Sequence, residues 1–117
     1  MAKETALTDP QIAEKLKALP GWTHQAGALR RRYQTDGWAT TLMLVNAIGF
    51  YAEAADHHPD LGVHWGSVEV ALNTHSAGGI TDQDFELARL FEQAALWRPG
   101  AGSAFRGTPK KFVSGGA

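Results

Sequence analysis

Residues 53–72, EAADHHPDLGVHWGSVEVAL, contain the change of pattern that decides the fold. Upstream of the double histidine, apolar residues recur at helical spacing, and the proline at position 59 disfavours the α conformation of the residue before it. A helix must therefore end near His58. After the proline, Val68, Val70 and Leu72 alternate with less apolar neighbours, which predicts a half-buried strand.

The helices on either side of this stretch have recognisable starts. Thr8 is followed three residues later by Gln11, and Thr81 is followed by Asp84. Each pair predicts a capping box, in which two side chains satisfy backbone N–H groups at the start of a helix. The predicted helices are residues 8–19, 38–56 and 81–97.

The central helix is the longest apolar-periodic stretch of the chain. Its apolar residues at helical spacing are Trp38, Leu42, Val45, Gly49 and Ala52. Because such a stripe lies on one side of a helix, we expect it to face the core.

Two pairs of short strands separate the helices. Too few residues join the strands of each pair for a parallel crossover, so each pair is predicted to be antiparallel. The fold class is therefore α+β, a four-stranded antiparallel sheet with three helices on one face in the order α-β-β-α-β-β-α. We expect one domain over residues 1–98 and a Gly/Pro-rich tail over residues 99–117. The predicted strands are residues 22–24, 29–33, 61–65 and 68–72.

The composition excludes several classes of protein. The chain has 117 residues and a net charge of -1, which suits a single core and lacks the basic surplus of a nucleic-acid binder. The run Arg30-Arg31-Arg32 is typical of a solvated face, less often of an anion contact. No cysteine is present, so disulfides and thiolate zinc sites are excluded. With no signal peptide and no membrane-spanning run, we expect a cytoplasmic protein.

The titratable residues around the proline indicate acid–base chemistry. Glu53 precedes His57 by four residues, so the two side chains can share a face of the last helical turn. His75 follows the strand that ends near Leu72, and a strand end can meet a helix end at one rim of a sheet. Two histidines across a pocket would supply an acid and a base near neutral pH. A structural role is the alternative, since a histidine at a helix end is more often a cap.

A metal site is a second chemical alternative. His57, His58 and His75 together with Glu53 or Asp84 offer ligands for zinc or iron. However, the five histidines contain no H-x-x-x-H or H-x-H spacing, and adjacent histidines often point apart. A metal site is therefore the weaker of the two chemical interpretations.

The same residues resemble a family motif. The chain contains E-x-x-x-H-H-P, then a strand ending in T-H, then G-[LI]-T-x-x-D. This combination resembles that of the pterin-4a-carbinolamine dehydratases, and Leu-Pro-Gly-Trp at 19–22 matches as well. The resemblance covers residues 8–97. The matching residues include Glu53, Asp56, His57, His58, Pro59, Trp65, Val68, Leu72, Thr74, His75, Gly79, Ile80, Thr81, Asp84, Leu87 and Ala88.

The resemblance implies a reaction and an assembly. The reaction dehydrates 4a-hydroxytetrahydrobiopterin to quinonoid dihydropterin, which recycles the cofactor of aromatic amino acid hydroxylases without a metal or cofactor. Members of the family are homodimers or homotetramers. By resemblance, His57 and His75 are the acid–base pair and His58 contacts the substrate, while Glu53 and Asp84 orient the imidazoles. The residues expected to line the pterin are Asp56, His57, His58, Pro59, Trp65, Asn73, Thr74, His75 and Ser76.

A protein-binding role is the alternative to catalysis. Animal members of the family also stabilise the dimer of a homeodomain transcription factor, and the neutral charge of this chain argues against direct contact with DNA. Two features depart from the family pattern. Trp65 stands where tyrosine is common, and the tail beyond Pro99 extends past the common end.

Overall fold

The computed structural model describes residues 5–107 and 112–114. The predicted order of helices and strands is confirmed, with a short 3₁₀ turn before the last helix and one further strand after it. The elements are α1 (Asp9–Leu16), β1 (Thr23–Gln25), β2 (Ala28–Thr35), α2 (Trp38–Ala55), β3 (Asp60–His64), β4 (Ser67–Leu72), η1 (His75–Ala77), α3 (Asp82–Leu96) and β5 (Val113–Ser114).

The strands form one antiparallel sheet in the order β1-β2-β4-β3. Both predicted hairpins are present, and β2 pairs with β4 at the centre, from Leu29 opposite Leu72 to Gln34 opposite Ser67. A fifth strand, β5, pairs with the end of β2, so the sheet is one strand larger than predicted. The sequence gives no sign of β5, because two residues in a Gly/Pro-rich segment show no periodicity.

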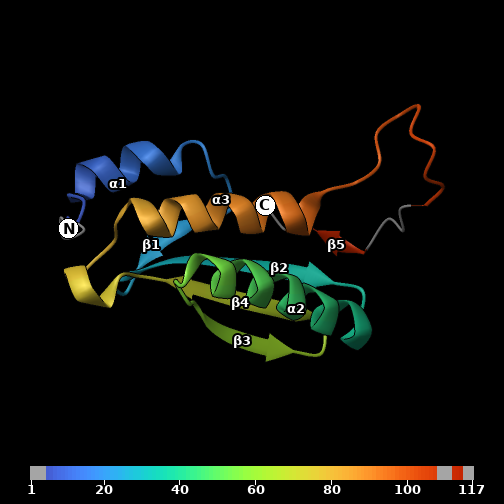
Figure 1. Ribbon diagram of the computed structural model, residues 1–117, viewed down its shortest axis with the longest axis horizontal. Helices are drawn as coiled ribbons and strands as arrows, with labels where there is room; N and C mark the ends of the chain where they lie inside the picture. The colour runs from blue at the N-terminus through green and yellow to red at the C-terminus, as the bar shows by residue number, and fades with distance from the viewer. Residues whose placement is uncertain (1–4, 108–111, 115–117) are drawn as a thin grey trace.

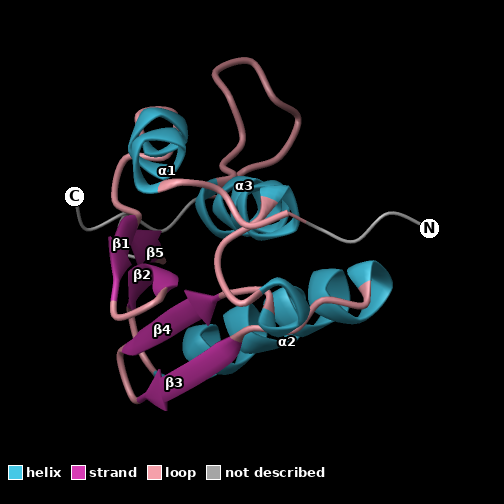
Figure 2. Ribbon diagram, turned by 90° about the vertical axis from the view of Figure 1, so that its left-hand side faces the viewer, coloured by secondary structure: helices cyan, strands magenta, loops and turns pink. Residues whose placement is uncertain are grey.

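The helices lie on one side of the sheet, as predicted (Figures 1 and 2). α2 packs beside α3, and α1 lies against β1 and over the start of α3, where Lys15 reaches Asp82. No helix among the described residues covers the other face of the sheet (Figure 2). The largest fully buried apolar side chains, which form the core between the sheet and the helices, are Tyr33, Phe91, Leu29, Ile48, Leu72, Val68 and Val70.

The predicted core stripe of α2 is confirmed only in part: Ala52 is buried and Val45 packs against the core, but Trp38, Leu42 and Gly49 are exposed. Trp38 and Leu42 are 48% and 40% exposed, together with Met43 at 53% and Phe50 at 70%. α2 has a single charged residue, so apolar side chains surround most of it and their spacing does not single out the buried side. The four exposed apolar residues are called the α2 apolar surface below. The residues of α2 that are buried are Thr40, Thr41, Leu44, Ile48 and Ala52.

The arginine run is not uniformly solvated, contrary to the prediction. Arg31 is only 5% exposed, because alternation along β2 turns it towards the core side. Its Nη2 and Nε donate to the two carboxylate oxygens of Glu92 on α3, at 3.0 and 3.1 Å. The Tyr33 hydroxyl and Trp22 Nε1 also donate to Glu92, at 2.7 and 2.8 Å. These four residues, the Glu92 cluster, join β2 and the Leu-Pro-Gly-Trp turn to α3.

The contacts within the Glu92 cluster shift the pKa values of Glu92 and Tyr33. Burial opposes ionisation of Glu92, but hydrogen bonds from Arg31, Tyr33 and Trp22 outweigh it and hold the pKa of Glu92 below its ordinary value. Burial, with the neighbouring Glu92 carboxylate, raises the pKa of the Tyr33 hydroxyl. Folding is therefore favoured at pH values where Glu92 is ionised and Tyr33 is protonated.

Candidate active site

The end of α2 sets the position of the double histidine. Asp56 adopts the left-handed conformation with a φ of 51°, and the His57 N–H donates to the Ala52 carbonyl at 3.1 Å. The helix therefore ends before His57, earlier than the proline requires, and Glu53 does not pair with His57 as expected. Glu53 instead lies 2.9 Å from Nε2 of His58, and both side chains are more than half exposed. An exposed pair of this kind contributes little to stability.

His57 pairs with Asp84 at the start of α3. Its Nε2 lies 2.6 Å from Asp84 Oδ1, the carboxylate is fully buried, and the imidazole is 12% exposed. The contact joins the segment after α2 to the first turn of α3, which are separated by 27 residues in the sequence. A buried carboxylate beside a histidine can hold the orientation and tautomer of the ring.

Asp84 performs two tasks with its two oxygens. Oδ2 accepts the Thr81 backbone N–H at 2.9 Å, and the capping box predicted from the sequence is confirmed. The same oxygen accepts the Thr74 hydroxyl at 2.8 Å, and the hydroxyls of Thr74 and Thr81 lie 2.8 Å apart. Oδ1 is left for His57. The position at the start of a helix favours the negative charge of the carboxylate.

The strand end that carries His75 reaches the same site. Thr74, directly before it, is buried and bonded to Asp84, and its backbone pairs with Gly79. His75 then begins η1 and is exposed. The structure thus joins the segment after α2 to the segment after β4 through Asp84, which contacts both His57 and Thr74. Asn73 is half-buried and Ser76 exposed on either side of these residues.

Trp65 lies at the other end of the fold. It occupies the turn between β3 and β4, where its ring is in contact range of Gly37 at the start of α2, and it is 69% exposed. His57 follows the end of α2, an 18-residue helix that is about 27 Å long at 1.5 Å per residue. Within one chain, Trp65 therefore does not share a site with His57.

A pocket of about 290 Å³ lies beside His57, between the end of α2 and the first half of α3. Its volume is at the lower end of the range for small-molecule sites. The sequence gave no sign that Gln83 and Glu86 line the same pocket as His57. The residues that line the pocket are Ala55, His57, Gln83, Glu86, Leu87 and Leu90.

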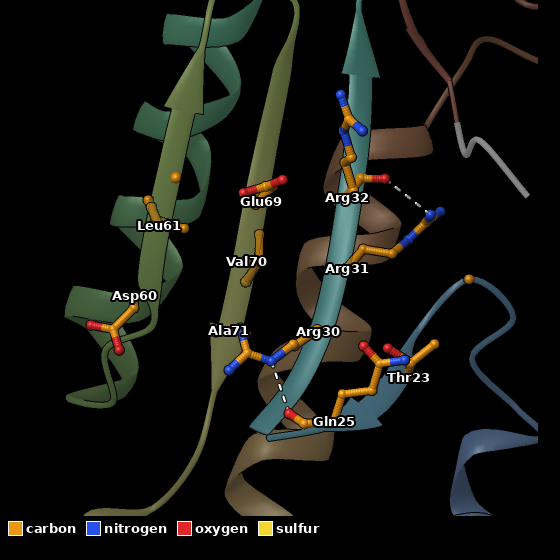
Figure 3. A pocket seen from close by; sticks show the side chains of 12 residues that line it. Thr23, Gln25, Arg30, Arg31, Arg32, Asp60, Leu61, Glu69, Val70 and Ala71 are labelled. Atoms are coloured by element: carbon orange, nitrogen blue, oxygen red, sulfur yellow. Dashed lines mark hydrogen bonds between the residues drawn. The ribbon is translucent and has the colours of Figure 1, made fainter. Parts of the chain in front are cut away.

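A larger concavity of about 560 Å³ lies on the face of the sheet without helices (Figure 3). Arg30 there is bonded to the Gln25 carbonyl at 2.8 Å, and Asp60 and Glu69 stand on the neighbouring strands. None of the residues predicted to act in catalysis or substrate binding lines it.

In residues 5–107 and 112–114, no three or more His, Cys, Asp or Glu side chains form a group that could hold a metal ion. Among the helices of the same residues, none is long and apolar enough to cross a membrane. The predicted cytoplasmic location stays a prediction.

Comparison with known proteins shows the family to which the chain belongs. The family model described as pterin 4 alpha carbinolamine dehydratase matches residues 5–94. A provisionally named pterin-4-alpha-carbinolamine dehydratase of Roseiflexus sp. (strain RS-1) is 40% identical over 89 residues, which are 76% of this chain and 96% of the relative. One of Mycobacteroides abscessus is 44% identical over 86 residues, 74% of this chain and 92% of the relative.

A solved structure agrees with this class. The crystal structure of a transcriptional coactivator/pterin dehydratase from Brucella melitensis superposes with a TM-score of 0.72 at 32% identity, and the match covers 75% of this chain and 96% of that one. The chain belongs to the pterin 4 alpha carbinolamine dehydratase family, as its motif indicated. The family match ends at residue 94, so β5 lies outside it.

Proposed function

We propose that this protein dehydrates a 4a-hydroxytetrahydropterin, such as 4a-hydroxytetrahydrobiopterin, to the quinonoid dihydropterin and water. The observation that carries the proposal is the half-buried His57, held by the buried carboxylate of Asp84 beside a pocket, in a chain of this family. The product would return to the cofactor cycle of an aromatic amino acid hydroxylase.

The reaction needs one proton donor and one proton acceptor. The C4a–O bond breaks and the hydroxyl leaves as water, which requires a proton. The N5–H bond breaks as the C4a–N5 double bond forms, which releases a proton. Histidines suit both tasks near neutral pH, and we assign them to His57 and His75. Asp84 orients His57, and Glu53 acts on His58, which contacts the substrate.

The substrate would lie between the end of α2 and η1, and of the residues proposed to contact it only His57 also lines the pocket of about 290 Å³. The residues proposed around the substrate are Asp56, Pro59, Asn73, Thr74 and Ser76, in addition to the histidines. Trp65 can contribute to the same site only from a second copy of the chain, because of its distance from His57 along α2.

A homodimer or homotetramer is part of the proposal. Two features support it: the α2 apolar surface, and the outer edge of β3, which pairs with no other strand among the described residues. Exposed apolar surface and open strand edges are common sites of self-association. Sedimentation equilibrium should give a dimer or a tetramer, and a monomer at all accessible concentrations would contradict this part of the proposal.

The activity is tested with chemically generated 4a-hydroxytetrahydropterin. Its spontaneous conversion to the quinonoid product is followed by stopped-flow absorbance, with and without the protein and with and without a chelator. We expect acceleration that the chelator does not change. No acceleration by correctly folded protein would reject the proposed function and favour a role in protein binding.

A further inference from the structure

The hydrogen bonds around Asp84 have one possible direction. An ionised carboxylate only accepts, so the Thr74 hydroxyl uses its one hydrogen to donate to Oδ2. The Thr74 oxygen must then accept from the Thr81 hydroxyl, 2.8 Å away. The Thr81 oxygen in turn accepts the backbone N–H of Gln83 at 3.2 Å. Every hydrogen of this buried chain therefore points towards Asp84.

This direction determines where the proton shared with His57 lies. Oδ2 has two donors, the Thr74 hydroxyl and the Thr81 N–H, and the first turn of α3 adds its positive dipole end. All three stabilise the negative charge of Asp84. The proton between Oδ1 and the imidazole therefore lies on Nε2 of His57. No described residue is hydrogen-bonded to Nδ1, the other ring nitrogen, which is then free to exchange a proton.

We propose that the buried hydroxyls of Thr74 and Thr81 are positioning groups that keep the proton on Nε2 of His57 and so make Nδ1 the nitrogen that acts on the substrate. The second half of this statement rests on the proposed dehydratase function, whereas the first half concerns the free protein. The substrate contact proposed for Thr74 would then come from its backbone, because its hydroxyl is bonded to Asp84. Its hydroxyl is turned inwards and the residue is 4% exposed.

Isosteric replacements separate the hydroxyls from the packing. Thr74→Val and Thr81→Val remove one hydroxyl each and keep the volume, while Thr74→Ser and Thr81→Ser keep the hydroxyl. A matched control is Thr41→Val, because Thr41 is also fully buried and its hydroxyl also pairs with a second threonine, Thr35, at 2.7 Å. Thr41 lies in the first turns of α2, at the end remote from His57.

The direct readout is the ring of His57 in the free protein, observed by ¹⁵N NMR of histidine-labelled samples and assigned by its loss in His57→Gln. In the wild type at a pH where the ring is neutral, we expect Nε2 protonated, Nδ1 unprotonated, and a downfield Nε2 proton protected from exchange. Thr74→Val should weaken or abolish this protected resonance. The two serine variants and Thr41→Val should retain it.

The kinetic readout uses the same variants. With Thr74→Val we expect kcat to fall roughly 10- to 100-fold with little change in KM, the size of effect that follows when a catalytic group is misplaced. Thr74→Ser should restore most of the rate, and Thr41→Val should lower the melting temperature without lowering kcat. If Thr74→Val does not fold, Thr81→Val decides, because it retains the N–H bond to Asp84.

Two results would overturn the proposal. One is a neutral His57 protonated on Nδ1 in the wild type. The other is a folded valine variant that keeps both the protected resonance and the wild-type kcat. If the wild type shows the predicted ring protonation but no dehydration, the positioning role stands and the proposed function fails, so the two failures are distinguishable.

Discussion

Glu92→Gln should lower the thermal stability of the protein far more than the same substitution at an exposed glutamate. The substitution keeps the shape of the side chain and an oxygen that can accept from Tyr33 and Trp22. It removes the charge that compensates Arg31, whose side chain is 4% exposed. It also places an NH₂ group where Oε2 accepted Nη2 of Arg31, so that two donors face each other.

The magnitude follows from the burial of the pair. Removing one partner of a buried ion pair costs about 3–5 kcal/mol, and the lower end applies here because Glu92 is 19% exposed. For a chain of 117 residues, each kcal/mol lost from the free energy of unfolding lowers the melting temperature by about 4 °C. The melting temperature at pH 7 should therefore fall by about 12 °C.

The pH dependence provides a second test of the same variant. Because the folded pKa of Glu92 lies below its ordinary value of 4.5, its contribution is complete above that value and is lost as the pH falls through the folded pKa. The difference in melting temperature between wild type and Glu92→Gln should therefore be constant near neutrality and shrink in acid.

The measurement is thermal unfolding by circular dichroism across this pH range. The control is Glu14→Gln, which breaks an ion pair with Lys17 in which both side chains are more than 70% exposed. Such a pair is worth about 1 kcal/mol or less, so the control should melt within a few degrees of the wild type. Equal effects of the two substitutions, or a difference for Glu92→Gln that does not change with pH, would mean that the buried charge of Glu92 does not stabilise the fold.

Three further predictions concern stability. As the pH rises above 10, the ordinary pKa of tyrosine, the wild type should lose stability because the unfolded state releases the Tyr33 proton first. Alkaline denaturation should show a smaller loss of stability in Tyr33→Phe. Gly21→Ala should cost about 1–3 kcal/mol more than Gly27→Ala in urea unfolding: both glycines have positive φ, but only at position 21 would a Cβ lie 2.7 Å from the Arg31 guanidinium. Deletion of residues 99–117 should lower stability by about 2–3 kcal/mol, because it removes β5 with a buried valine. An unchanged melting temperature would mean that this segment is a dispensable tail.

Local chemistry made much of the fold predictable. Both capping boxes form as predicted at Thr8 and Thr81, since their partners lie only three residues away. The alternation of apolar residues gave β4, and the short connections gave the hairpins. The buried side of α2 was not predictable, because one charge among 18 residues leaves no polar face to mark the solvent side.

The pairs that the candidate site residues form were only partly predictable from the sequence. The spacing of Glu53 and His57 suggested a contact within one helix, but the left-handed Asp56 ends the helix and turns the histidine towards α3. The contact with Asp84 spans 27 residues, and only the folded chain brings the two together. The sequence predicted the capping box at Thr81. It did not show that the second carboxylate oxygen of Asp84 would pair with His57.

The most direct test of the central claim is the stopped-flow rate of 4a-hydroxytetrahydropterin dehydration by wild type, His57→Ala and His75→Ala. We expect acceleration by the wild type and a loss of roughly 10²–10⁴-fold in each variant, with the fold retained, because each histidine is assigned one proton transfer. Variants that stay folded and as active as the wild type would mean that neither histidine carries a proton transfer of the reaction.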